Sequence, residues 1–179
     1  MPIGSQSSYR YIMQGVLATN PKSILDLGIG FGMNGCGIRN WYDLGLYPFK
    51  TKLVGVEGFE GYRNPAWELY DKVIVGNILE VIDGLEVFDM ILITDVIEHF
   101  DKQQGVELLN KLKTKVSKCV MVSTPGVWIE QGEYMGNKLE AHKSMWSVKD
   151  FTDLGYGIVQ DGTIDDMGHM MITADFIKR

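Results

Sequence analysis

The amino-acid sequence predicts one α/β domain built on a doubly wound sheet of seven strands, most of them parallel. Short apolar runs alternate with helix-like stretches along the 179 residues, which indicates βαβ units joined by right-handed crossovers. The run Phe88–Thr94 is almost continuously apolar, as expected of a strand that is covered on both faces. Nothing helical fits between Gln160 and Met170, so the last two strands should form an antiparallel hairpin.

The strands are expected where β-branched and other apolar residues cluster between turn residues. The first of them ends at glycines, and the fifth is stopped by Thr124-Pro125-Gly126. In chain order the expected strands are Ser23–Leu27, Lys52–Glu57, 72–76, Phe88–Thr94, 118–123, 156–160 and Met170–Ile177.

Four helices are expected between these strands, at 32–44, 64–70, 101–116 and 147–154. The clearest is 101–116, where Val106, Leu109 and Leu112 fall on one face and charged residues on the other. The last begins at Ser147, which has the position of an N-cap in a capping box, and it ends at Gly155.

Composition and charge limit the class of protein. The apolar share of 45% and the charged share of 22% are those of a globular chain, so we expect a single domain, 1–179, with residues 1–22 as a short N-terminal cover. The net charge of −6, with scattered Lys and Arg, argues against a nucleic-acid partner. Without a long apolar run, a signal peptide or paired cysteines, a cytoplasmic protein with no membrane partner is expected. The sequence is compatible with a homodimer.

A glycine-rich turn after the first strand is the strongest functional signal. In the segment 24–35, the strand runs into Gly28, Gly30 and Gly32, and a helix follows. Glycines allow the backbone to approach a ligand, and the amides at the start of a helix then face it. Asp26, just before the turn, would repel a pyrophosphate but suits a ligand that carries an ammonium and a sulfonium.

A dinucleotide site is the competing interpretation of the same turn. Gly30-x-Gly32-x-x-Gly35 formally matches the dinucleotide fingerprint, and Glu57 follows at a suitable distance. That fingerprint should begin where the strand ends, whereas this strand ends at Gly28. The position of the strand therefore favours a different nucleoside ligand over NAD.

A second group of polar residues follows the fourth expected strand. Asp95, Glu98 and His99 lie in the sequence Thr-Asp-Val-Ile-Glu-His that begins at Thr94. In open parallel sheets, ligands bind beyond the carboxyl ends of the strands, near the switch in strand order. These residues and the glycine turn are therefore expected to border the same cleft.

The sequence resembles class I S-adenosylmethionine-dependent methyltransferases, of the small-molecule, methyltransferase-domain-11-like type. Asp26 with the glycine turn is similar to the family's first motif, the segment 53–57 to its second strand, 75–78 to its third, and 88–100 to the fourth strand with Asp-Val-Ile-Glu-His. The resemblance implies a Rossmann-like strand order of 3-2-1-4-5-7-6 and S-adenosylmethionine as cofactor, with S-adenosylhomocysteine as product. It also implies the cofactor-binding residues Asp26, Gly28, Gly30, Gly32, Glu57, Gly58, Asn77, Ile78, Asp95 and Val96.

The segment 137–156 resembles a His-x-Ser-x-Trp motif that lies over the acceptor side in part of that family. It makes His142 and Trp146, in the loop 126–146, candidates for acceptor contact. Trp146 could equally anchor the loop to the sheet. The other acceptor-side candidates are Tyr9, Glu98 and Trp128, with a structural role favoured for Glu98. His99 and His142 are the candidate catalytic bases, because a free imidazole titrates near neutrality.

The expected function is methyl transfer to a small-molecule oxygen or nitrogen acceptor. No metal is expected, because Asp95 lacks a carboxylate and amide partner after the fifth strand. Cys36 and Cys119 have no metal-ligand spacing and no Pro-Cys context, so neither is expected to act as a nucleophile. The alternatives are a non-catalytic nucleotide-binding or regulatory module of the same fold, and an NAD(P)-dependent oxidoreductase.

Overall fold

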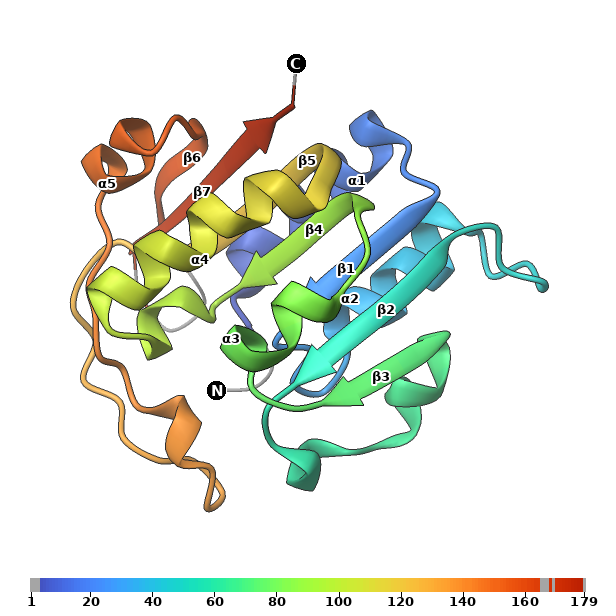
Figure 1. The fold of residues 1–179 in the computed structure, drawn as a ribbon, viewed down its shortest axis with the longest axis horizontal. Coiled ribbons are helices and arrows are strands. Elements are labelled where there is room, and N and C mark those ends of the chain that lie inside the picture. The colour runs from blue at the N-terminus through green and yellow to red at the C-terminus, as the bar shows by residue number, and fades with distance from the viewer. Residues whose placement is uncertain (1–3, 165–167, 169, 179) are drawn as a thin grey trace.

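The computed structural model, which describes residues 4–164, 168 and 170–178, contains one seven-stranded sheet (Figure 1). The strand order is β3-β2-β1-β4-β5-β7-β6, as predicted. The strands β1 to β5 pair in parallel, and β7 runs antiparallel to both β5 and β6. The strands are β1 (Ser23–Leu27), β2 (Lys52–Glu57), β3 (Lys72–Val75), β4 (Phe88–Thr94), β5 (Val116–Pro125), β6 (Gly157–Ile164) and β7 (Met170–Ile177).

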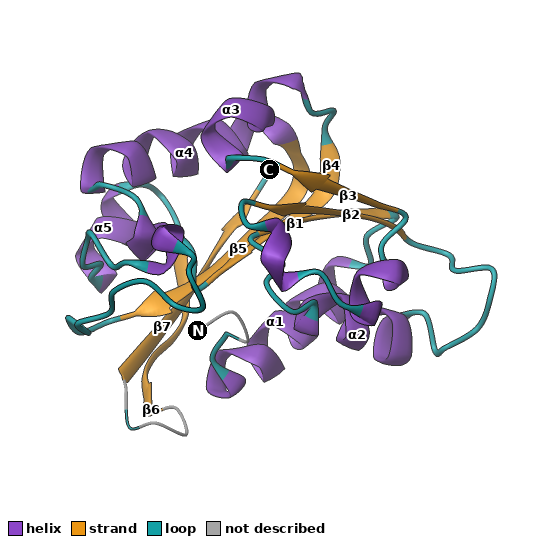
Figure 2. Cartoon of the chain, turned by 90° about the horizontal axis from the view of Figure 1, so that it is seen from below, coloured by secondary structure: helices purple, strands orange, loops and turns teal. Residues whose placement is uncertain are grey.

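Helices cover both faces of the sheet, so the domain has three layers (Figure 2). The helices are α1 (Gln6–Thr19), α2 (Met33–Gly37), α3 (Ile78–Val81), α4 (Lys102–Lys115) and α5 (Val148–Asp153). Leu108, Leu109 and Leu112 of α4 pack on one face, and Ile12 and Val16 of α1 belong to the core on the other. In the described part of the chain, none of the helices has the length and apolarity needed to cross a membrane.

The expected helix 32–44 is wrong in its extent. Helix α2 ends at Gly37 and continues as a π-helical turn, Ile38–Tyr42, after which Leu44 has a φ of 59° and the chain leaves the helix. A buried guanidinium stabilises this irregular turn, because Arg39 hydrogen-bonds the Asp43 carboxylate at 2.7 Å and the carbonyls of Leu69 and Thr51. It also ties the turn to the segments beside β2 and β3.

Two other helical segments differ from the expectation. Residues 64–70 form only a 3-10 turn, Pro65–Leu69, which the Asn64 side chain caps by accepting the backbone N–H of Ala66 at 2.8 Å. Helix α1 was not expected, although its buried residues Ile12, Met13 and Val16 have helical spacing. It packs on the sheet beside β5, β6 and β7, and its first turn reaches the carboxyl edge of the strands.

Candidate active site at the carboxyl edge of the sheet

A cavity lies where the chain leaves β1 and β4 toward opposite faces of the sheet, which is the usual ligand position in this class of fold. Its volume is about 230 Å³, several times the roughly 30 Å³ that one water occupies. Ten residues named from the sequence line it: Tyr9, Gly28, Gly30, Glu57, Gly58, Asn77, Ile78, Asp95, Val96 and His99. The structure thus brings together residues from α1 and from the ends of four strands.

The glycine turn forms one wall of this cavity. Gly28 has a φ of +75°, and a Cβ there would lie 2.3 Å from a methyl carbon of Val96. Gly30 has a φ of +51° and donates its backbone N–H to a carboxylate oxygen of Glu57 at 2.9 Å. Only glycine meets both demands at position 28, the left-handed backbone and the close approach of Val96, which follows β4.

Glu57, at the end of β2, faces the turn directly. Its second carboxylate oxygen accepts the backbone N–H of Phe59 at 2.9 Å, so two amides fix the group in place. Burial raises its pKa, while the hydrogen bonds from Gly30 and Phe59 act in the opposite direction. Each oxygen keeps a further lone pair, so the carboxylate can accept two more hydrogen bonds from a ligand in the cavity.

Asp26 and Gly32 are not among the residues that line the cavity, and their contact with a ligand stays a prediction. The buried carboxylate of Asp26 accepts hydrogen bonds from Tyr70 Oη at 2.6 Å and from Asn34 Nδ2 at 3.0 Å. Burial raises its pKa to about 6. Gly32 caps α2 in a left-handed conformation, and its Cβ position faces Ala66. Asp26 reaches the cavity only through Asn34, which lines it.

Asn77 and Ile78 begin α3, next to the end of β3. The side-chain oxygen of Asn77 accepts the backbone N–H of Leu79 at 2.9 Å and so caps the helix. Its amide N–H₂ is a donor group, and a donor of this kind can pair with a ring nitrogen of a base. The cap fixes the direction of this side chain at the cavity wall.

Asp95 connects β4, β5 and the N-terminal segment. It has a φ of +54°, its carboxylate accepts Ser123 Oγ at 3.0 Å, and it accepts the backbone N–H of Ser5. Its own N–H donates to the carbonyl of Ser123. The negative charge of this side chain therefore lies at the cavity wall with Gly4 and Ser5 over it.

The two candidate bases lie next to each other. The ring centroids of His99 and His142 are 5.0 Å apart, and Glu98 belongs to the same cluster. Burial lowers the pKa of His99 to about 4 and also lowers that of His142, whereas burial raises the pKa of Glu98 to about 8. Both imidazoles are therefore neutral at pH 7, and the near-neutral pKa expected from the sequence does not apply to His99.

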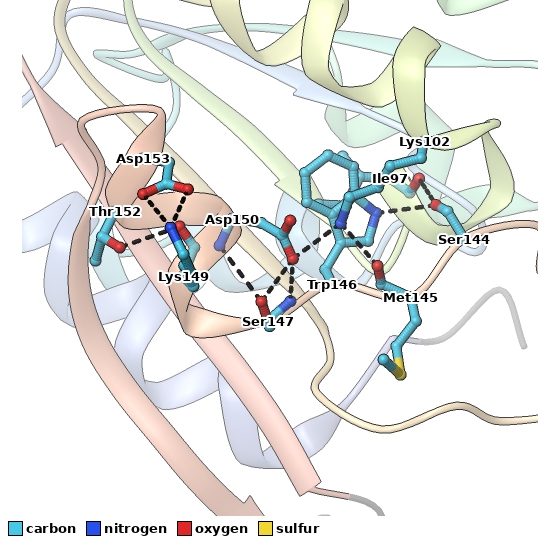
Figure 3. A network of polar contacts seen from close by, with 10 residues as sticks. All are labelled: Ile97, Lys102, Ser144, Met145, Trp146, Ser147, Lys149, Asp150, Thr152 and Asp153. Atoms are coloured by element: carbon cyan, nitrogen blue, oxygen red, sulfur yellow. Dashed lines mark hydrogen bonds and ion pairs between the residues drawn. The ribbon is translucent and has the colours of Figure 1, made fainter.

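Trp146 is not a surface for an acceptor, because its side chain is fully buried. Figure 3 shows its indole N–H pointing to Ser144 Oγ. The two atoms are 3.0 Å apart, and Lys102 Nζ lies 3.8 Å from the centroid of the indole ring. It also packs against Phe151. Of the two roles that the sequence left open, the structure places Trp146 as the anchor of the loop.

The loop 126–146 is held against the segment after β4 by backbone contacts. The amides of Lys143 and Ser144 both donate to the carbonyl of Glu98, and Lys102 Nζ donates to the carbonyl of Met145 (Figure 3). Trp128 is half exposed, does not line the cavity, and donates to Glu130. Glu98, favoured for a structural role, is buried and accepts Thr124 Oγ1 at 2.9 Å.

Sequence reasoning missed several residues of the cavity. The loop contributes Asn137, Leu139, Glu140 and Lys143. In its turn Lys138–Glu140, the side chain of Leu139 lies against Gly58. Helix α1 and the start of α2 add Ser8, Ile12, Met33 and Asn34. The helical spacing in α1 was a usable signal, whereas the path of the loop has no counterpart in the sequence pattern.

Comparison with known proteins supports the assignment of the fold. No protein-family model matches the sequence, and no curated protein does. Among solved structures, didemethyltoxoflavin N1-methyltransferase of Burkholderia thailandensis, solved with its substrate and S-adenosylhomocysteine, has a TM-score of 0.68 at 14% identity, over 97% of this chain and 79% of its own.

Two further structures have the same architecture. Magnesium protoporphyrin IX methyltransferase of Synechocystis PCC 6803, with bound S-adenosylmethionine, has a TM-score of 0.67 at 11% identity, over 97% of this chain and 79% of its own. The methyltransferase domain of bacterial CtHen1 has a TM-score of 0.59 at 21% identity, over 97% of this chain and 98% of its own. The chain therefore has the Rossmann-like fold of class I S-adenosylmethionine-dependent methyltransferases.

Proposed function

We propose that the protein is an S-adenosylmethionine-dependent methyltransferase that acts on an oxygen or nitrogen atom of a small molecule. The observation that carries the proposal is the pairing of Glu57 with the glycine turn, through the 2.9 Å hydrogen bond from Gly30, at the wall of one cavity. The fold shared with methyltransferase structures that hold this cofactor or its product supports the same assignment.

The residues at the cavity fit an adenosyl sulfonium. Glu57 offers two anchored oxygen atoms to a pair of vicinal hydroxyls, and Asn77 offers an amide donor beside the apolar side chain of Ile78 for a base. Gly28 presents bare backbone to the cavity, and Asp95 adds a negative charge that suits a cationic ligand. When bound, the cofactor would supply an electrophilic methyl group on sulfur.

The chain's own contribution is alignment and exclusion of water. Proximity catalysis requires the acceptor atom to be held roughly 3 to 3.5 Å from the methyl carbon. Tyr9 from α1, and the turn Lys138–Glu140 from the loop, cover the cavity from two sides and limit the entry of water. His99 presents a neutral imidazole at the acceptor side, with His142 behind it. With its pKa of about 4, His99 accepts a proton readily only from an acceptor that is already acidic.

The glycines of the dinucleotide fingerprint weigh against the NAD alternative. The Cβ position of Gly35 lies 2.5 Å from the ring of Tyr70, and its N–H donates to the hydroxyl of that tyrosine. Gly32 faces Ala66. Both glycines serve packing within the protein, so their spacing in the sequence does not describe a pyrophosphate contact.

The test is a comparison of ligands by thermal shift and calorimetry. S-adenosylhomocysteine at 100 times its Kd should raise the stability by about 2.7 kcal/mol. For a chain of this size that corresponds to a rise in Tm of roughly 5–11 °C. We expect no shift with NAD. Stabilisation by NAD alone would refute the proposal. Tight cofactor binding with no methyl transfer across acceptor classes would favour the non-catalytic module.

A further inference from the structure

Glu98, His99 and His142 form a cluster that the proposed cofactor site does not use. One potential ligand atom from each of the three lies within 4.8 Å of the other two. The first two residues follow β4, and the third comes from the loop 126–146, 43 positions later in the chain. Among the described residues, this is the only group of at least three His, Cys, Asp or Glu side chains with such spacing.

The hydrogen bonds of the two rings leave the same nitrogen free on each. His142 Nδ1 lies 2.8 Å from the carbonyl of Ile129, and His99 Nδ1 lies 3.4 Å from the carbonyl of Ala141. A carbonyl only accepts hydrogen bonds, so each neutral ring carries its proton on Nδ1 and a lone pair on Nε2. On each ring, Nε2 is therefore the nitrogen that can donate a lone pair to a ligand.

This arrangement has the outer contacts that metal-ligating side chains generally have. A ligating imidazole donates its other N–H to a carbonyl or carboxylate, which fixes the ring and its tautomer, and a ligating carboxylate is itself hydrogen-bonded. Ile129 and Ala141 supply the two carbonyls, and Thr124 Oγ1 holds the Glu98 carboxylate at 2.9 Å. Every member of the cluster is therefore oriented by a neighbour that does not itself belong to it.

The scaffold around the cluster holds its two halves together. The carbonyl of Glu98 accepts the amides of Lys143 and Ser144. The buried Trp146, which Figure 3 shows, anchors the chain just beyond them. Metal–nitrogen bonds of about 2.0–2.1 Å place tetrahedral ligand atoms about 3.3 Å apart. Three ligand atoms within 4.8 Å of one another would have to approach by at most roughly 1.5 Å, and rotation of the two partly exposed rings is the movement that would bring their Nε2 atoms to a shared ion.

We propose that Glu98, His99 and His142 bind a divalent transition-metal ion at the acceptor side of the cavity. Two imidazoles with one carboxylate, which would lose its proton on binding the cation, suit Zn²⁺, Fe²⁺, Co²⁺ or Mn²⁺ rather than Ca²⁺, which prefers oxygen ligands. Three protein ligands leave a coordination position open, and His99 places it at the cavity. This revises the expectation of no metal, which considered only the segment after the fifth strand.

The metal site narrows the class of acceptor. This inference about the acceptor rests on the proposed methyl transfer. A hydroxyl bound at the open position would release its proton to solvent, because a bound cation lowers the pKa of the oxygen it holds. The oxygen would keep the electron pair that forms the new bond to the methyl carbon, while the carbon–sulfur bond breaks toward sulfur. The acceptor is then a hydroxyl compound, and the two histidines are ligands instead of bases.

The test is a Co²⁺ titration of chelator-treated protein, followed by visible absorption and checked by Zn²⁺ displacement. We expect saturable 1:1 binding and a ligand-field spectrum in the wild type. His99→Ala and His142→Ala should weaken binding by more than about 100-fold, since even second-shell changes cost 10–100-fold. Glu98→Gln keeps the side-chain shape and should also weaken it. Glu86→Gln changes an exposed carboxylate outside the cluster and should have no effect.

Binding of S-adenosylhomocysteine, measured on the same variants, separates the two proposals and reports on folding. Absence of saturable Co²⁺ binding, or a spectrum unchanged in folded His142→Ala protein, would overturn the metal site and leave the methyltransferase proposal intact. Co²⁺ binding that depends on both histidines, without binding of either cofactor form, would refute the methyltransferase proposal and leave the metal site standing.

Discussion

Replacing Gly28 with alanine adds one methyl group at the most crowded point of the glycine turn. The new Cβ would lie 2.3 Å from Val96 Cγ2, so the segment after β4 and the turn must separate by roughly 1 Å to reach ordinary contact. The left-handed backbone at φ +75° costs about 1–2 kcal/mol for alanine, and overpacking costs about 1–3 kcal/mol more. We expect a loss of about 2–5 kcal/mol in the free energy of unfolding.

A double-mutant cycle with Val96→Ala isolates the steric part of this loss. The single change Val96→Ala should cost about 1–2 kcal/mol, because two buried carbons are removed. In the double variant the next atom met by the new Cβ is Cβ of residue 96 at 3.5 Å, which is ordinary contact. The overpacking cost of about 1–3 kcal/mol should then disappear, which gives a favourable coupling energy of that size.

The assay is equilibrium unfolding in urea, with binding of S-adenosylhomocysteine measured on each variant. Gly84→Ala is the matched control: Gly84 is exposed, has no neighbouring atom within 4 Å of its Cβ position, and lacks a positive φ, so no loss is expected. Strictly additive effects of the two substitutions would show that the turn does not pack against Val96 and would refute the geometry assigned to the cavity wall.

Three further predictions concern the scaffold. Trp146→Ala should lower the free energy of unfolding, measured in urea, by about 3–5 kcal/mol. At urea concentrations below the unfolding transition, the Kd for S-adenosylhomocysteine should be unchanged. A weaker affinity with normal stability would place Trp146 in the site. Asp43→Ala leaves the buried Arg39 without its closest carboxylate and should lower the free energy of unfolding in urea by about 3 kcal/mol. Lys149→Ala breaks an exposed ion pair and should cause no measurable change. Equal effects of the two variants would contradict the buried network around Arg39.

The third of these is a pH dependence. Asp26 has a pKa of about 6 in the folded protein against 3.8 in the unfolded chain, so raising the pH between these values ionises the unfolded state first and lowers stability. Asp26→Asn removes this pH-dependent contribution to the free energy of unfolding. Its stability relative to wild type should rise by about 2 kcal/mol between pH 4 and pH 7. A difference independent of pH would contradict the buried position beside Tyr70 and Glu57.

The sheet was predictable because its signals are local. Phe88–Thr94 is apolar at nearly every position since β4 is buried on both faces, and the observed strand has the same limits. The end of β6 and the start of β5 were not predicted, because alternating polar residues there pair with β7 and β4. Helix α1 was missed because its apolar positions are interrupted by glycine and polar residues, and its N-cap Ser5 makes no side-chain cap.

The candidate site was predictable only where residues follow strand ends. Gly30 and Glu57 meet because β1 and β2 are parallel neighbours, a relation that strand order fixes. The position of Asp26 beside Tyr70 and Asn34 was not predictable, because sequence spacing does not say to which face a side chain near a strand end turns. The cluster of His99 with His142 depends on the path of a long loop, and its position is set by tertiary contacts that have no period in the sequence.

The most direct test of the central claim is calorimetric titration of S-adenosylhomocysteine into wild type, Glu57→Ala and Glu60→Ala. Glu60 is an exposed carboxylate three residues away that does not line the cavity, so its loss should leave Kd unchanged. Glu57→Ala removes hydrogen bonds to a charged acceptor, each contributing about 1.5–3 kcal/mol, and Kd should rise by at least about tenfold. Equal affinity in all three proteins would contradict the assignment of this cleft as the adenosyl site.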